Sequence, residues 1–221
     1  MCNGYSQKMT CNNIQSFLIK YFVCFISFSL FLLTSHAIDA SSKNARVALQ
    51  TTLEEIMAIL QSEEFKAPDK KMVRRNAMLY VLEYRFDFEE MAKRSLAKEW
   101  KKRTPVEREQ FVMIFGQLIE NSYISKIESY SDEEILFFGE KKKKNKVLVE
   151  TTVRRNNTDF SVSYKLLDKN GRWKVYDVII EGVSLVRNYR SQFKNFLGKQ
   201  SYADLVKRLE SKVEKLILEN T

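Results

Sequence analysis

The hydrophobic period of the sequence changes from helical to alternating and back to helical, and this pattern limits the possible fold more than any other feature. Between residues 104 and 130 the apolar side chains recur every three or four positions, as on one face of a helix. Between residues 134 and 181 they alternate, and only short turns separate the alternating runs. Successive strands joined by short turns pair in antiparallel fashion. We therefore expect an antiparallel sheet within an otherwise helical protein.

Four strands are expected, at residues 134–140, 146–155, 158–167 and 172–181. Their turns are Asn156-Asn157 and the loop that ends at Gly171. Helices are expected on both sides of them in the chain, at residues 43–60, 70–84, 87–100, 104–130, 183–197 and from 201 onward. The sequence therefore predicts an α+β fold, with a four-stranded antiparallel sheet and helices packed on one of its faces.

Several helix ends carry recognisable signals. Thr104-Pro105-Val106-Glu107 reads as a capping box with proline at the first helical position. Asp87 is expected to cap the third helix, and Ser201, three residues before Asp204, to cap the last one. Gly182 is expected to end the sheet and Gly198 to end the helix before the last.

The first 37 residues are typical of a signal peptide. Lys8 and Lys20 precede an apolar run at residues 21–33, which is short for a bilayer span, and no acidic residue occurs before Asp39. Small residues at Ser35 and Ala37 predict cleavage after Ala37, and an uncleaved anchor is the alternative. The predicted organisation is a signal peptide at 1–37 and one exported, periplasmic domain at 38–221.

Cleavage would remove every cysteine and the single histidine, because Cys2, Cys11, Cys24 and His36 all precede it. The remaining chain has lost the commonest nucleophile activators and transition-metal ligands, so we expect no catalytic residue, no metal site and no cofactor. Without residues 1–37, which contain two lysines and no acid, the formal net charge of +9 becomes +7. An exported basic protein meets anionic lipid before it meets nucleic acid, so no nucleic-acid partner is expected.

The segment EGVSLVRNYRSQF at residues 181–193 carries a resemblance, together with WKVYDV at 173–178 and Phe86-Asp87-Phe88. In this order the segments resemble the MlaC/toluene-tolerance family of periplasmic phospholipid-binding proteins, over about residues 47–196. The resemblance implies an NTF2-like sheet with helices around an apolar cavity. It also implies a shuttle between an inner-membrane ABC transporter complex and an outer-membrane lipoprotein complex, which maintains outer-membrane lipid asymmetry. A hopanoid or solvent-tolerance carrier of the same family is an alternative.

The residues expected to form an acyl-chain pocket are apolar side chains of the long helices and the strands. Filling an ordinary core is the alternative for each of them. They are Phe88, Met91, Phe111, Phe115, Tyr123, Phe160, Val162, Tyr164, Trp173, Val175, Val178, Ile180, Val183 and Tyr189.

Two sets of cations are candidates for polar contacts. Arg187 and Arg190 are candidate headgroup contacts, because guanidinium groups bind phosphate in bidentate fashion, although they could instead tie helix to sheet. The lysine-rich hairpin at residues 141–146 could touch an anionic membrane transiently or an acidic partner, or be a solvated loop.

Two other classes of function remain open. An exported NTF2-like enzyme would act on a small apolar substrate and need a buried carboxylate, for which Asp87, Asp177 and Glu181 are the candidates. An adaptor that joins two membrane complexes through its basic surface would have a fully packed interior.

Overall fold

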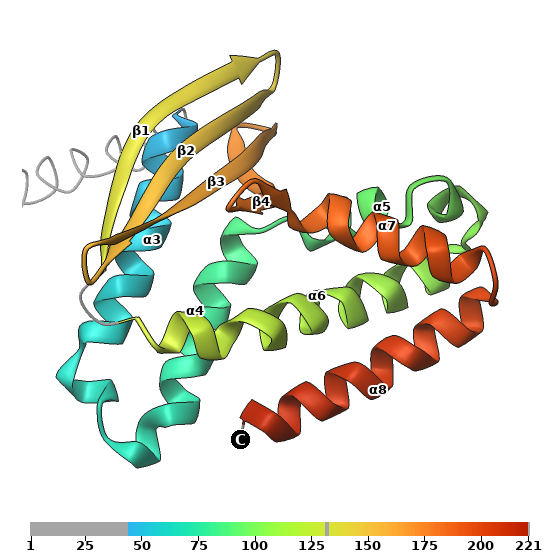
Figure 1. The fold of residues 1–221 in the computed structure, drawn as a ribbon, viewed down its shortest axis with the longest axis horizontal. Helices are drawn as coiled ribbons and strands as arrows, with labels where there is room; N and C mark the ends of the chain where they lie inside the picture. Colours follow the sequence, from blue (N-terminus) through green and yellow to red (C-terminus); the bar gives the residue numbers. More distant parts are fainter. Residues whose placement is uncertain (1–43, 131–132, 221) are drawn as a thin grey trace, which may run out of the picture. The chain divides into compact units, whose positions relative to one another are not determined.

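The computed structural model describes residues 44–130 and 133–220. The predicted signal peptide, with its cysteines and histidine, lies outside the described residues. The helices are α3 (Ala45–Gln61), α4 (Lys71–Arg85), α5 (Phe88–Leu96), α6 (Pro105–Glu128), α7 (Leu185–Leu197) and α8 (Tyr202–Asn220) (Figure 1). Short 3-10 turns occupy Glu63–Phe65, Pro68–Lys70 and Ala97–Lys102. All six predicted helices are confirmed. The α-helical part of the third helix ends at Leu96, because Ala97 has a φ of 52°, and a 3-10 turn follows it.

The sheet is antiparallel and its strands follow chain order, β1-β2-β3-β4-β5. They are β1 (Glu134–Lys143), β2 (Lys146–Arg155), β3 (Thr158–Lys169), β4 (Arg172–Ile180) and β5 (Val183–Ser184). The expected number of four is wrong by one. Glu181 and Gly182 both have positive φ, 48° and 77°, and they turn the chain back so tightly that Val183 pairs with Ile180.

The helix caps formed as the sequence predicts. The Thr104 hydroxyl accepts a hydrogen bond from the Glu107 backbone N–H, and the Glu107 carboxylate accepts one from the Thr104 N–H. Asp87 accepts from the Glu90 N–H at 3.0 Å, and Ser201 and Asp204 bond each other reciprocally at the start of α8. These contacts satisfy backbone donors that a helix leaves unpaired at its first turn.

An irregularity in β4 decides which side chains share a face of the sheet. Lys165 pairs with Asp177 but Leu166 pairs with Val175, so Tyr176 is an extra residue in β4. Neighbouring side chains in a regular strand alternate between faces. The bulge therefore lets Trp173 and Val175 lie on the same face as Val178 and Ile180, although their numbers differ in parity.

The buried side chains form three clusters. The first joins α5, α6, α7 and α8, the second joins α3 to the sheet, and the third joins α3, α4 and α6 through Ile56, Leu60, Met78 and Ile124. Figure 1 shows α3 lying against the strands, and α6 and α8 running together as two long helices. Leu167 and Tyr176, on the other face of the sheet, join the first cluster, so helices contact both faces.

The end of α8 is fastened to two other helices. The Arg75 guanidinium forms a buried ion pair with Glu128, and it also donates to the Asn220 carbonyl oxygen at 3.1 Å. The Asn220 side-chain amide donates to the Asn121 carbonyl oxygen at 2.9 Å. None of the helices in the described part of the chain is long and apolar enough to cross a bilayer.

Candidate functional site

One face of the sheet is apolar along its whole length. We call it the inner face and define it by the row Val149, Tyr164 and Val178, which are direct cross-strand partners. Beside this row lie the partners Thr151, Val162 and Ile180 on one side, and Val147, Leu166 and Val175 on the other. Since cross-strand partners share a face, these rows form a single surface, against which Ala45, Ala48 and Leu49 of α3 pack.

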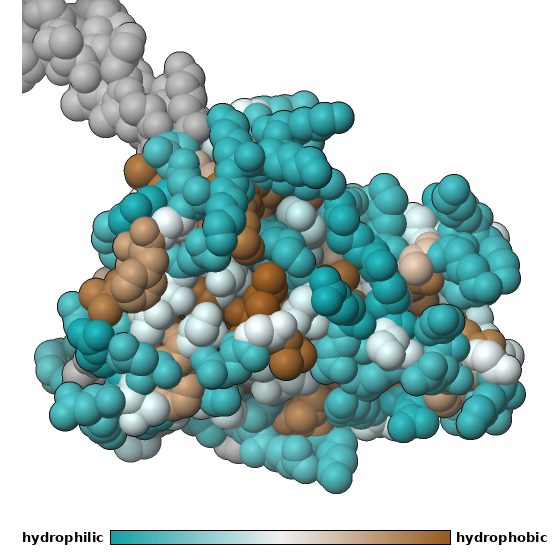
Figure 2. All heavy atoms as spheres, turned by 45° about the horizontal axis from the view of Figure 1, so that its top comes forward, coloured by the Kyte–Doolittle hydropathy of each residue, from teal (hydrophilic) through white to brown (hydrophobic). Residues whose placement is uncertain are grey.

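Exposure rises along the inner face from one end to the other. Leu166 and Val175 are 0% exposed, whereas Phe160 is 42% and Val183 57% exposed. Val162 and Ile180, between these pairs, are partly buried. We call the end at Leu166 and Val175 the closed end, and the end at Phe160 and Val183 the open end. Figure 2 shows apolar side chains gathered in the middle of one face of the molecule, surrounded by hydrophilic ones.

Helices contribute partly buried apolar side chains opposite the inner face: Leu53 from α3, Phe86 at the end of α4 and Tyr123 from α6. Burial raises the pKa of the Tyr164 phenol, with the Tyr130 hydroxyl as a smaller cause. Burial likewise raises the pKa of Tyr123. Both raised pKa values are expected in a region of low polarity, because desolvation disfavours the charged form of a phenol.

One carboxylate lies on α6 one turn before Tyr123. Burial raises the pKa of Glu120 to about 7, and the neighbouring Glu83 carboxylate of α4 adds to this shift. Glu120 therefore titrates near neutral pH, unlike an ordinary glutamate.

The fourteen residues predicted to line a pocket do not meet in one place. Tyr164, Trp173, Val175, Val178, Val162 and Ile180 belong to the sheet cluster, and Tyr123 packs against both this cluster and the helical one. Phe160 and Val183 are exposed at the open end. The helical cluster contains the other five, which are Phe88, Met91, Phe111, Phe115 and Tyr189.

That helical group is tightly packed against itself. The Phe115 ring meets the Tyr189 ring edge-on, with centroids 5.3 Å apart, and Phe111 meets Phe193 in the same way at 5.7 Å. Phe111, Phe115 and Met91 are completely buried. Their contacts are those of a core.

The two arginines predicted near a headgroup have different surroundings. Arg190 donates to the Arg94 carbonyl oxygen at 2.8 Å, so it ties α7 to α5. Arg187 is exposed and lies in the first turn of α7, four residues after Val183. Of these two arginines, only Arg187 is therefore close in sequence to Val183 at the open end.

Asp177 lies on the face of the sheet opposite the inner face. Its carboxylate accepts hydrogen bonds from the Lys165 ammonium at 2.8 Å, the Ser184 hydroxyl at 2.7 Å and the Val186 N–H at 3.1 Å. Asp87 pairs with Lys169 at 2.6 Å and caps α5, and the exposed Glu181 accepts from the Ser161 N–H. All three carboxylates named as candidate bases thus have structural partners. Within residues 44–130 and 133–220, no group of histidine, cysteine, aspartate and glutamate side chains could hold a metal ion.

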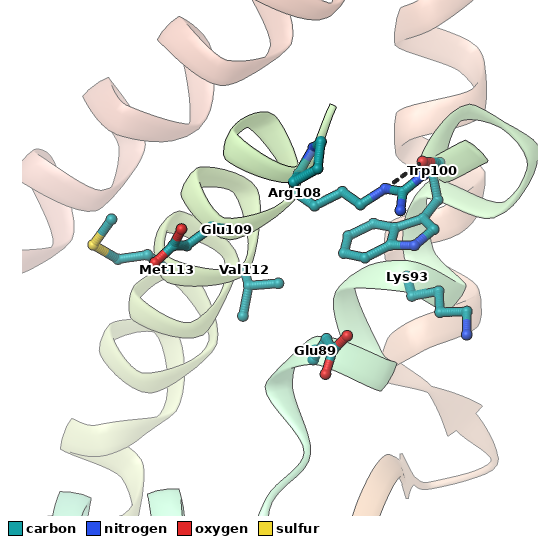
Figure 3. A pocket seen from close by; sticks show the side chains of 8 residues that line it. Glu89, Lys93, Trp100, Arg108, Glu109, Val112 and Met113 are labelled. Atoms are coloured by element: carbon teal, nitrogen blue, oxygen red, sulfur yellow. Dashed lines mark hydrogen bonds between the residues drawn. The ribbon is translucent and has the colours of Figure 1, made fainter. Parts of the chain in front are cut away.

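Two grooves lie outside the sheet cluster. One, of about 730 Å³, separates α5 and the following 3-10 turn from the start of α6, and Figure 3 shows its lining. Arg108 reaches across the Trp100 ring to donate to the Trp100 carbonyl oxygen, and Glu89, Lys93 and Glu109 also line it. Four of its eight lining side chains are charged, in contrast to the apolar side chains of the sheet cluster. The other, of about 400 Å³, lies between α7 and α8 and includes Tyr189 and Phe193.

On the helical side of the inner face, sequence reasoning predicted Tyr123 but missed Leu53 and Phe86. Leu53 belongs to the predicted apolar stripe of the first helix, so its spacing was a usable signal. Phe86 follows α4 and forms a bridge to Val175, and its position could not be read from periodicity because it lies between two helices.

A family model described as MlaC protein matches residues 50–211. The chain belongs to the MlaC family. A relative from Haemophilus influenzae, called intermembrane phospholipid transport system binding protein MlaC, is 25% identical over 202 residues, which cover 86% of this chain and 91% of that protein.

A solved structure of a phospholipid-binding protein from Ralstonia solanacearum, in complex with a phospholipid, is similar to this MlaC-family chain. The TM-score is 0.70 at 20% identity, and the match covers 79% of this chain and 99% of that one. At this identity the likeness establishes the fold, which is the α+β fold expected from the sequence.

Proposed function

We propose that the chain is a periplasmic carrier that holds the acyl chains of a phospholipid between the inner face of its sheet and helices α3 and α6. The observation that carries this proposal is the apolar inner face, whose exposure rises steadily toward the open end. Membership of the MlaC family supports it, as do the name of the relative from H. influenzae and the phospholipid in the R. solanacearum structure.

The energetics explain why the lining must be apolar. Moving a 16-carbon chain out of water is worth roughly 13 kcal/mol, at about 0.8 kcal/mol per CH₂ group. A bilayer already supplies this free energy, so a carrier must nearly match it. We assign the acyl chains to Tyr123, Val162, Tyr164, Val178 and Ile180, and the entrance to Phe160 and Val183.

Arg187 is the proposed contact for the headgroup phosphate, because it lies in the first turn of α7 beyond Val183. A guanidinium there can bind phosphate while it remains in water. The carrier function needs no chemical step, and the engagement of Asp177 by three donors favours a carrier over an enzyme.

The proposed route follows from the family and from the predicted signal peptide. After cleavage near Ala37 the carrier would exchange lipid with an inner-membrane ABC transporter complex and an outer-membrane lipoprotein complex. The words "intermembrane phospholipid transport system" in the relative's name support such a route.

The test is to purify the protein, extract it with organic solvent and identify the extracted lipid by mass spectrometry. Ile180→Trp should lower the phospholipid recovered per protein at least about threefold, because the larger ring occupies acyl-chain space at the partly buried edge of the inner face. Ile179→Trp is the matched control, since Ile179 is the next residue of the strand and faces the opposite side. A protein that yields no phospholipid and takes none up from vesicles contradicts the proposal. Equal losses in the two variants would contradict the choice of face.

A further inference from the structure

The β1–β2 hairpin ends in a lysine-rich turn at the closed end of the sheet. Lys143 pairs with Lys146 across the turn, and Lys144 has a φ of 56°. We call Lys142, Lys143 and Lys144 the lysine tip. All three are exposed, and no acidic side chain of the described residues forms an ion pair with them. Lys141, just before them, is paired with Glu150 at 2.9 Å.

The register brings further cations to the same end. Lys146 pairs with Leu167, and Leu167 pairs with Lys174, so the three strands end side by side. Arg172 flanks the β3–β4 turn on one side, whereas Lys169 on the other side is paired with Asp87 at 2.6 Å. Burial lowers the pKa of Lys174, and the neighbouring Arg85 and Arg172 guanidinium groups lower it further.

Exposed aromatic side chains border this group. The Lys174 ammonium lies 4.7 Å from the centroid of the Tyr84 ring and donates to the Tyr84 carbonyl oxygen. Tyr80, one turn earlier on α4, is also exposed. Tyrosine beside lysine is typical of surfaces at the boundary between water and lipid headgroups.

We propose that the lysine tip, with the cations around Lys174, docks the protein on an anionic lipid surface. The composition favours lipid over an acidic protein face. The tip is all lysine, whereas protein interfaces are depleted in lysine and enriched in arginine. Lysines act on anionic lipid as independent point charges, without the fixed geometry that a carboxylate partner needs.

Docking at this end keeps the entrance clear. Strand β2 runs ten residues from Lys146 at the tip to Arg155 beside the open end. At about 3.3 Å per residue, the two ends lie roughly 30 Å apart. The surface would hold the carrier at a membrane with its entrance free for a protein partner. This inference does not require that the cargo is known.

The test is co-sedimentation of the purified protein with vesicles of phosphatidylcholine alone, and of phosphatidylcholine with about 40% phosphatidylglycerol. We expect binding only to the second kind, at about 0.1 M salt and much less at about 0.5 M salt. Each lysine near such a surface contributes about fivefold in affinity, so the triple change Lys142→Glu, Lys143→Glu and Lys144→Glu should weaken binding at least about 100-fold.

The matched control reverses three exposed lysines of the α7–α8 region: Lys194→Glu, Lys199→Glu and Lys207→Glu. It has the same net charge as the tip variant and should keep binding within about threefold. Equal losses in both triple variants, or no binding of the original protein to anionic vesicles, overturn the inference. Unchanged binding of the tip variant overturns it as well.

Phospholipid content separates this inference from the carrier proposal. The tip variant should retain its co-purified lipid while it loses vesicle binding. Ile180→Trp should do the reverse, because it lies on the inner face away from the tip. A tip variant that loses its lipid as well contradicts an independent docking surface.

Discussion

Asp177 illustrates how hydrogen-bond donors compensate a buried charge in this protein. The carboxylate is almost completely buried, yet donors from β3, β5 and α7 surround it. Arg75 is similar, with Glu128 of α6 and the Asn220 carbonyl oxygen of α8 as its acceptors. Removing one partner of such a group leaves an uncompensated charge, which costs about 3–5 kcal/mol. These charges therefore fix the relative positions of elements distant in the sequence.

Glu120 differs, because burial and Glu83 raise its pKa to about 7. Its pKa in the unfolded chain is about 4.3, so between these values the folded protein holds a proton that the unfolded chain has lost. Stability therefore falls as the pH rises from about 4.3 to 7, and the full penalty remains above pH 7. Glu120→Gln should remove this penalty and stabilise the protein by about 1–2 kcal/mol at pH 8, after allowance for solvent screening.

Urea unfolding at pH 5 and pH 8 measures this effect. The gain from Glu120→Gln should be small at pH 5 and larger at pH 8. Glu134→Gln is a suitable control, since Glu134 is exposed on β1. A gain of equal size at both pH values would mean that the carboxylate does not titrate in this range.

At the scale of elements, local signals in the sequence were sufficient wherever local chemistry decides the structure. The capping box at Thr104, the cap at Asp87 and the turn at Asn156 all depend on residues within three positions of one another. The bulge at Tyr176 and the strand β5 depend on pairing with β3 and β4, which no single segment encodes. The same limit applies to the candidate site, because the separation of Phe115 from Tyr164 arises from helix packing.

The turn that makes β5 provides a test at this scale. Gly182 has a φ of 77°, in the left-handed region, whereas Gly198 has a φ of −73° at the end of α7. Gly182→Ala should lower the free energy of unfolding by about 1–2 kcal/mol, because a Cβ atom is strained at positive φ. Gly198→Ala should change the free energy of unfolding little, because alanine readily adopts the negative φ of this position. Thermal and urea unfolding distinguish the two, and similar costs would contradict the backbone explanation.

In the molecule as a whole, the tightly packed core and the proposed lipid-binding region lie in different places. The cluster of α5, α6, α7 and α8 contains the fully buried aromatic rings, and the closed end of the sheet is equally well buried. At the open end of the inner face, exposed apolar side chains lie beside partly buried ones. A carrier needs a rigid body and one region that receives hydrocarbon, and we propose the open end of the inner face as that region.

Bound phospholipid should stabilise the folded protein. A ligand that binds only the folded state stabilises it by about 2.7 kcal/mol when present at 100 times its dissociation constant. Stripping phospholipid should therefore lower the melting temperature by about 5 °C or more. Hydrogen exchange should quicken most in α3 and β3, which adjoin the inner face, and less in α8, whose buried side chains belong to the helical cluster. Ile180→Trp should show a smaller difference between stripped and loaded protein, since its side chain already fills part of the space. Equal melting temperatures before and after stripping would mean that lipid does not bind where the open end of the inner face suggests.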